Sequence, residues 1–226
     1  MKRTFYFTLL ICFISGLNGF AQNITLEREN RDEAYVENII QRSQKIVDQL
    51  EINESDIAAN VRNIIANRYF ELNDIYDARD AALKEIKEDN LLSKDEKSVL
   101  NENIQNKKDA QLYQTHFGYI SKLSLFLNEK QIETVKDGMT FGVLNVTYTA
   151  TLDMIPSLTE EEKVQIYSWL IEAREYAMDA ESSSEKHKVF GKYKGRINNY
   201  LSQRGYNLTQ ERIEWEKRIK EREQSK

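Results

Sequence analysis

The feature of this sequence that most limits its possible folds is the near absence of helix-breaking residues after residue 21. Pro156 is the only proline, and eight glycines are spread over 226 residues. The polar positions are filled mainly by Glu, Lys, Gln and Asn, which long helices accommodate well. The sequence therefore predicts an all-α protein.

A repeated motif marks the starts of several predicted helices. An apolar residue, a capping residue and, three positions later, a Glu or Gln occur together at 92–96, 127–131 and 158–162. In this capping box, side-chain oxygens bind backbone N–H groups that the first turn leaves free. The boxes and the apolar periodicity predict helices at 32–51, 54–89, 93–127, 129–136, 158–181, 185–204 and 209–223. Short connections favour antiparallel neighbours, so we expect a single-domain bundle of about six to seven helices.

The segment from 137 to 156 differs from the rest of the chain. It is rich in β-branched residues and contains Gly138 and Gly142 as helix breakers. A strand is compatible with this composition, but no second strand is predicted to pair with it. Apolar residues from 146 to 154 keep helical spacing, so we expect an irregular stretch followed by a short helix that ends at Pro156.

The first 21 residues have the pattern of a secretory signal peptide. Lys2 and Arg3 precede an apolar run, and residues 19–21 form a small-x-small exit. We expect residues 1–21 to be removed and residues 22–226 to form one exported helical domain, most simply in a bacterial periplasm. The only cysteine, Cys12, would leave with the signal, so the mature domain would contain no disulfide.

Charge and hydropathy argue against several kinds of partner. Removing Lys2 and Arg3 from the 32 basic and 37 acidic residues leaves a net charge of about −7, which disfavours nucleic acid. No later apolar run approaches the ~20 residues of a membrane span. The two histidines lack metal-ligand spacing, and no cysteine remains, so we expect neither a metal nor a cofactor.

The main candidate site begins on the helix predicted at 158–181. A stripe spaced four, three, four, three lies on one face of this helix. It consists of Gln165, Trp169, Glu172, Tyr176 and Asp179. Flat rings alternate there with hydrogen-bonding groups, which is typical of a surface that binds a sugar. The edge of an ordinary amphipathic helix would show the same pattern.

The next predicted helix adds basic and aromatic candidates, namely His187, Lys192, Tyr193 and Arg196. Lys192 and Arg196 could bind a carboxylate or sulfate, and Arg196 is the better candidate because its planar fork matches such groups. A solvated basic helix face is the alternative. The glycine spacing at 191–195 lacks the Lys-Ser/Thr end of a phosphate loop, which excludes nucleotide binding on this motif.

Three residues outside this region form a secondary candidate site: Arg79, Asp80 and His116. Asp80 belongs to a series of aspartates spaced by three, which an internal salt-bridge network explains as well as a cation or substrate site. His116 has mostly apolar neighbours at helical spacing. It is therefore either a hydrogen-bonded core histidine or a site residue.

Four strings of the sequence resemble a known protein family. They are DGMTFGVLNVTY at 137–148, LDMIPSLTEEE at 152–162, WLIEAREYAMDA at 169–180 and FGKYKGRINNYL at 190–201. Together they are similar to a family of bacterial domains of unknown function to which sugar binding is attributed by inference. The resemblance covers about residues 32–215. It implies an exported protein encoded among polysaccharide-utilisation genes, beside lyases, sulfatases and glycoside hydrolases, and it implies no catalytic residue.

These observations lead to one functional hypothesis and two alternatives. The leading hypothesis is a periplasmic protein that binds fragments of an acidic (uronic or sulfated) polysaccharide during its degradation. The first alternative is an enzyme on such fragments, a lyase, dehydratase or hydrolase. Glu172 and Asp179 would be its acid and base, although their backbones are seven helical residues, or about 10.5 Å, apart. A His–Tyr pair is the other possible acid and base. The second alternative is a periplasmic chaperone or scaffold. The oligomeric state stays open.

Overall fold

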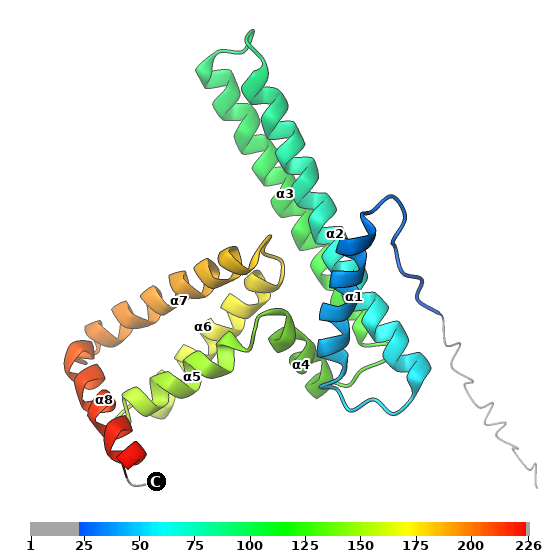
Figure 1. Ribbon diagram of the computed structural model, residues 1–226. Helices are drawn as coiled ribbons and strands as arrows, with labels where there is room; N and C mark the ends of the chain where they lie inside the picture. The colour runs from blue at the N-terminus through cyan, green and yellow to red at the C-terminus, as the bar shows by residue number, and fades with distance from the viewer. Residues whose placement is uncertain (1–22, 225–226) are drawn as a thin grey trace, which may run out of the picture.

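The computed structural model describes residues 23–224, and the predicted signal peptide at 1–21 lies outside this range. Within it the chain is all-helical, as the sequence predicts, and contains no strand (Figure 1). Its helices are α1 Glu33–Val47, α2 Ser55–Glu88, α3 Lys94–Leu123, α4 Glu129–Met139, α5 Val143–Met154, α6 Glu160–Met178, α7 Ser183–Gln203 and α8 Leu208–Gln224. None of these helices combines the length and the hydropathy that crossing a bilayer requires.

The three capping boxes predicted from the sequence are present. Ser93, Asn128 and Thr159 each accept a hydrogen bond from the backbone N–H three residues later, at the starts of α3, α4 and α6. In each box the Glu or Gln at that third position bonds back to the backbone of the capping residue. These local bonds fix where the helices begin, which explains the agreement with the predicted starts.

The segment at 137–156 contains the expected short helix, α5, and with it the described chain has eight helices, slightly more than the predicted six to seven. A break separates α4 from α5 because Phe141 and Gly142 both adopt left-handed backbone, with φ of 60° and 65°. Such a conformation cannot continue a right-handed helix. α5 then ends at Met154, two residues before Pro156, as the sequence predicts. Gly138, expected to be a breaker, instead lies inside α4.

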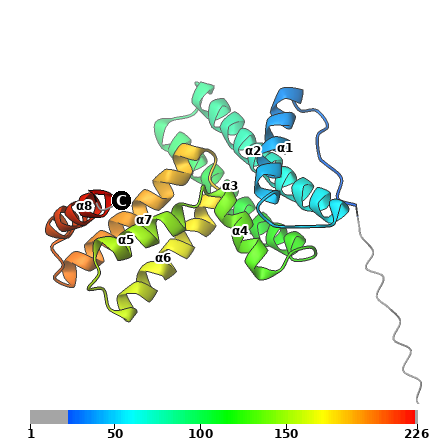
Figure 2. The same cartoon turned by 60° about the horizontal axis from the view of Figure 1, so that its bottom comes forward.

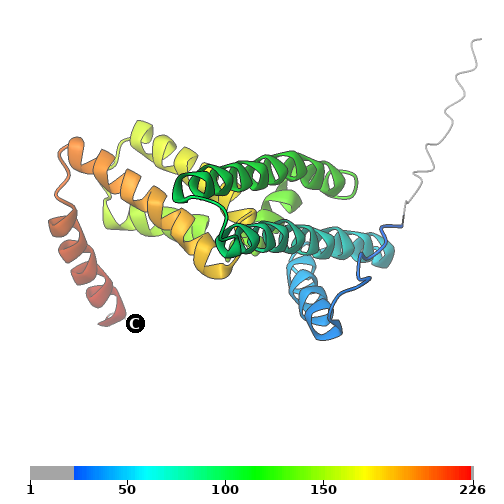
Figure 3. The ribbon, with the colours of Figure 1, turned by 90° about the horizontal axis from the view of Figure 1, so that it is seen from above.

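The long α2–α3 hairpin projects from the rest of the molecule (Figure 1). α1 packs against α2 and also contacts α4, close to the base of the hairpin. α6 and α7 lie antiparallel, and α5 and α8 pack on this pair (Figure 2). Seen from above, α3 runs beside the region where α6 ends and α7 begins (Figure 3). The candidate site lies there.

The first four helices and the last four are each packed around their own group of buried apolar residues. One, with Val61, Leu123 and Met139, fills the space between α1, α2, α3 and α4. Another, with Leu170 and Phe190, lies between α5, α6, α7 and α8. Met178, the last residue of α6, belongs to the first group. The end of α6 is therefore anchored in the core at the base of the hairpin.

Gly138 marks the closest approach of α4 to α1. A Cβ at this position would lie 2.9 Å from Cγ1 of buried Ile46, so we expect Gly138→Ala to destabilise the fold by about 1–3 kcal/mol through overpacking. Gly191 in α7 has no atom within 4 Å of such a Cβ. Gly191→Ala should therefore stabilise by about 0.5–1 kcal/mol, since it removes the entropy of a helical glycine. Urea unfolding measures both effects, and shifts of the same sign would contradict this packing.

Candidate functional site

A cavity of about 960 Å³ lies where α2 and α3 face α6 and the start of α7. Three aromatic side chains that line it are largely exposed: Tyr113 at 70%, Phe117 at 56% and Tyr176 at 63%. Tyr113 and Phe117 pack edge to face on α3, with ring centroids 5.2 Å apart. Tyr176 lies on α6. The cavity therefore presents uncovered aromatic rings from two helices that are far apart in the sequence.

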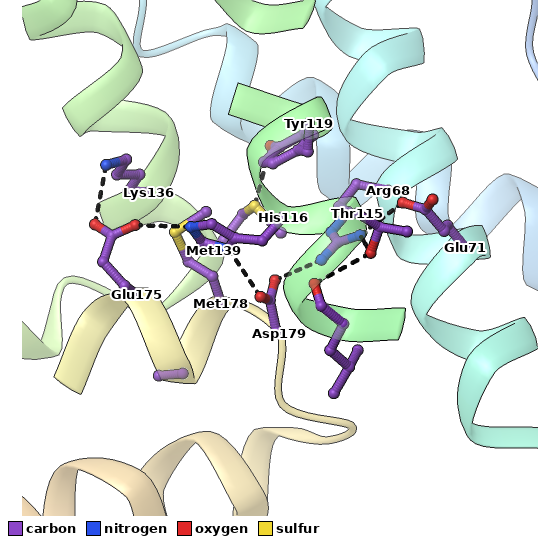
Figure 4. Close-up of polar contacts among 12 residues, drawn as sticks. Arg68, Glu71, Thr115, His116, Tyr119, Lys136, Met139, Glu175, Met178 and Asp179 are labelled. Atoms are coloured by element: carbon purple, nitrogen blue, oxygen red, sulfur yellow. Dashed lines mark hydrogen bonds and ion pairs between the residues drawn. The ribbon is translucent and has the colours of Figure 1, made fainter. Parts of the chain in front are cut away.

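His116 joins the two sides of this cavity (Figure 4). It comes from α3, and its Nδ1 lies 2.8 Å from Oδ2 of Asp179 at the end of α6. Its Nε2 lies 3.3 Å from Oε2 of Glu175, one turn earlier on α6. Both ring nitrogens are thus engaged by carboxylates, and the histidine side chain is only 13% exposed.

A buried arginine, Arg68, contacts the same aspartate as this histidine. Arg68 of α2 has a fully buried side chain, and its Nη2 donates to Oδ1 of Asp179 over 2.7 Å. Its Nη1 donates to Glu71 and to the Thr115 hydroxyl, over 2.6 Å and 2.7 Å. Since the backbone carbonyl of Asp179 accepts a hydrogen bond from Tyr76, this aspartate links α6 to both helices of the hairpin.

The charge network continues from Glu175 toward α4. Lys136 donates to Glu175 over 2.9 Å and also pairs with Glu133. Arg174, buried beside them on α6, donates to Glu133 and to Asp137. The ion pairs therefore form one chain that connects α2, α3, α6 and α4 (Figure 4 shows its centre).

The network changes the charge state of its members. Hydrogen bonds with Asp179 and Glu175 raise the pKa of His116 to about 9, although burial opposes them. The histidine is therefore a cation at neutral pH, with each ring N–H donating to a carboxylate. Burial also lowers the pKa of Lys186 to about 8. This lysine caps the end of α6, because its Nζ donates to the carbonyls of Ala177 and Met178.

Several residues singled out from the sequence meet at this cavity. They are Arg79, His116, Glu172, Tyr176, Asp179 and Lys192. Three of the four Lys and Arg side chains in the lining form ion pairs: Arg79 with Glu181, Lys108 with Asp109, and Lys188 with Glu185. The fourth, Lys192, has no ion pair within the described part of the chain. Asp80 lies outside the lining and pairs with Arg79.

Trp169 and Arg196 lie in a second hollow, of about 520 Å³, formed by α6 and α7. The Arg196 guanidinium stacks over the indole at 4.5 Å from its centroid, and Tyr200 packs edge to face against the same ring. The indole face that the sequence suggested for a sugar is thus already covered by Arg196. Lys192 lines both hollows.

Two further candidates lie elsewhere. Tyr193 faces inward and is 8% exposed in the core between α6 and α7, because α7 turns every third or fourth residue toward α6. Burial raises the pKa of its phenol to about 12, helped by a hydrogen bond with Glu172. His187 is exposed on another face of α7, where its ring lies 5.8 Å from that of Phe141. The structure brings neither side chain into the cavity.

Sequence reasoning missed several residues of this site. Glu175 lies one turn before Asp179 on α6, and Tyr113 and Phe117 lie within one turn of His116 on α3. Helical spacing around the two chosen residues could have identified all three. Arg68 lies on the apolar stripe of α2, which predicts a buried arginine with acidic partners, but sequence spacing does not reveal that one of these partners is Asp179. No group of three or more potential metal ligands gathers between residues 23 and 224.

Most of the chain matches the sequence model of a known protein family. The sequence model of one family, described as "Protein of unknown function (DUF3826)", matches residues 36–221. This range covers most of the 226 residues, so the chain belongs to that family. No curated protein matches the chain significantly. The family description states no activity, which leaves the geometry of the site as the basis for a functional argument.

Proposed function

We propose that this member of the DUF3826 family binds fragments of an acidic polysaccharide in the bacterial periplasm and takes part in the use of that polysaccharide. The observation that carries the proposal is the cavity between the α2–α3 hairpin and the α6–α7 pair, where exposed aromatic rings surround fixed charged groups. Its volume of about 960 Å³ is within the range of small-molecule sites.

The aromatic lining suits a sugar because a sugar ring has apolar C–H faces and a rim of hydroxyls. Tyr113, Phe117 and Tyr176 offer uncovered rings against which such faces can stack. The carboxylates of Asp109, Glu172 and Glu181 line the same cavity and can accept hydrogen bonds from hydroxyls. A ligand with both apolar faces and many hydroxyls fits this combination best.

The network beneath the rings supports binding through preorganisation. The exposed rings of α3 and α6 are on opposite sides of the cavity. The contacts of His116 and Arg68 with Asp179 fix the position of α6 relative to the hairpin. A rigid site loses less entropy when it binds a ligand. The network therefore stabilises the fold and the binding surface together.

Binding is favoured over catalysis by the state of His116. A general base needs a free lone pair, but both nitrogens of this ring contact carboxylates and the pKa of about 9 keeps them protonated. An enzyme acting as a lyase, dehydratase or hydrolase would have to use other groups, such as the phenols of Tyr113 and Tyr176. The exposed surface of the cavity is mostly apolar, as a chaperone groove would be, but eleven titratable Asp, Glu, Lys, Arg and His side chains also line it and suit a polar ligand better.

We expect Tyr176→Ala to weaken binding of oligosaccharides about fivefold to a hundredfold, because a stacked ring contributes about 1–3 kcal/mol. Tyr167→Ala is the matched control. Tyr167 lies on the same helix and is also exposed, but it packs against Tyr148 outside the cavity. Calorimetric titration with oligogalacturonates and with sulfated galactan oligosaccharides measures both variants.

The same samples, analysed by mass spectrometry after incubation, distinguish binding from catalysis. Unchanged oligosaccharides together with a Tyr176-dependent affinity would support the proposed function. Shortened or unsaturated products would favour the enzymatic alternative. If neither ligand series binds to the parent protein, the proposed function is wrong.

A further inference from the structure

We infer that the acidic group of the ligand binds outside the main cavity, at Arg196 in the second hollow, and that one oligosaccharide spans both hollows. This inference rests on the proposed function and assigns separate tasks to the two hollows. The main cavity takes a sugar ring between aromatic side chains. The second hollow takes the carboxylate or sulfate of a neighbouring sugar.

The charge of the main cavity argues against an acidic group there. Six Asp and Glu side chains line it, against four Lys and Arg side chains and the protonated His116. Most of the basic groups already pair with acidic neighbours, as described above for Arg79, Lys108 and Lys188. A carboxylate placed among these groups would gain little attraction and would meet nearby negative charge.

The second hollow has the opposite character. Lys192 and Arg196 line it together with the amides of Asn199 and Gln203, and among residues 23–224 no Asp or Glu belongs to its lining. Its polar groups are therefore mostly hydrogen-bond donors or neutral amides. This set of groups matches a carboxylate or a sulfate.

Arg196 is held in place but is not saturated with hydrogen bonds. Its guanidinium carbon lies over the Trp169 ring, 4.5 Å from the centroid, and its one ion pair in the described chain is a long contact of 3.5 Å from Nη1 to Glu172. The stacking orients the planar fork, which leaves donors free for a bidentate contact. Trp169 is thus a positioning residue that acts through Arg196.

The two hollows adjoin each other along α6 and α7. Lys192 lines both, and Glu172 of the main cavity reaches Arg196 of the second hollow. Tyr176 and Trp169 are seven residues apart on α6, or about 10.5 Å along the helix. A single sugar ring cannot contact both positions, so the ligand must contain more than one sugar.

The test combines a protein variant with a matched change in the ligand. We expect Arg196→Gln to bind oligogalacturonates about tenfold to a hundredfold more weakly, since hydrogen bonds to charged groups are lost. The same variant should bind carboxyl-reduced oligogalacturonates as the parent does. Sulfated galactan oligosaccharides and their desulfated forms, used in parallel, show which acidic group the site prefers. Lys194→Gln is the charge-matched control, because Lys194 is exposed on the same helix and lines neither hollow.

Two further measurements separate the inference from the function on which it rests. Trp169→Leu should weaken the acidic ligands but spare the reduced ones, and galacturonate monomer should bind at least tenfold more weakly than the oligomers. If the parent binds the acidic oligomers and Arg196→Gln changes acidic and reduced ligands equally, or not at all, this inference is wrong and the proposed function stands. If the parent binds none of these ligands, both are overturned.

Discussion

Asp179→Asn should lower the free energy of unfolding by about 3 kcal/mol, because it removes the carboxylate that compensates a fully buried arginine. The Arg68 side chain has no exposed surface, and its acidic partners in the described chain are Asp179 and Glu71. Glu71 remains in the variant but is partly exposed at 39%, so it replaces little of the lost interaction. Urea denaturation followed by circular dichroism measures the change.

Two controls make this result specific to the buried pair. Asp74→Asn removes a carboxylate that pairs with Arg31 at the surface, where Asp74 is 57% exposed, and should cost at most about 1 kcal/mol. The double variant Arg68→Met with Asp179→Asn should cost less than the sum of the single variants, since neither charge is then left unpaired. Additive costs would show that the two side chains do not interact in solution.

The fold was largely accessible from the sequence because local interactions determine most of it. Side chains three residues apart form the capping boxes at Ser93, Asn128 and Thr159, so sequence spacing reveals them. The break at Gly142 and the end of α5 before Pro156 are also local effects. Gly138 was misjudged, because its role is to let α4 approach Ile46 of α1, which is a long-range contact.

The site was less accessible because its contacts join residues that are far apart in the chain. Asp179 meets His116 across 63 positions and Arg68 across 111. Spacing on α6 placed Tyr176 and Asp179 on one face, but it could not show that Trp169 on the same stripe is covered by Arg196. The basic helix gave the same ambiguity, since Lys192 reaches both hollows while Tyr193 turns into the core.

His116 should make the stability of the protein fall as pH rises from about 6.5 to 9. Its pKa is raised from 6.5 to about 9 by its hydrogen bonds with Asp179 and Glu175. The folded state therefore holds a proton that the unfolded state releases first, so this stabilisation is complete below pH 6.5 and is lost through pH 9. A shift of this size corresponds to about 3 kcal/mol.

Lys186 acts in the opposite direction over part of this range, so a single pH profile cannot isolate the histidine. Burial lowers the pKa of Lys186 from 10.5 to about 8. The unfolded state then binds more protons between these values, and the contribution of Lys186 to stability rises with pH. The informative quantity is the difference in unfolding free energy between the parent and His116→Gln, measured in urea from pH 6 to pH 10, because Lys186 contributes equally to both proteins. This difference should be largest at pH 6 and should shrink by about 3 kcal/mol as pH rises through 9. A difference that stays constant with pH would mean that His116 has the same pKa in the folded and unfolded states, and that its contacts with Asp179 and Glu175 do not favour the charged ring.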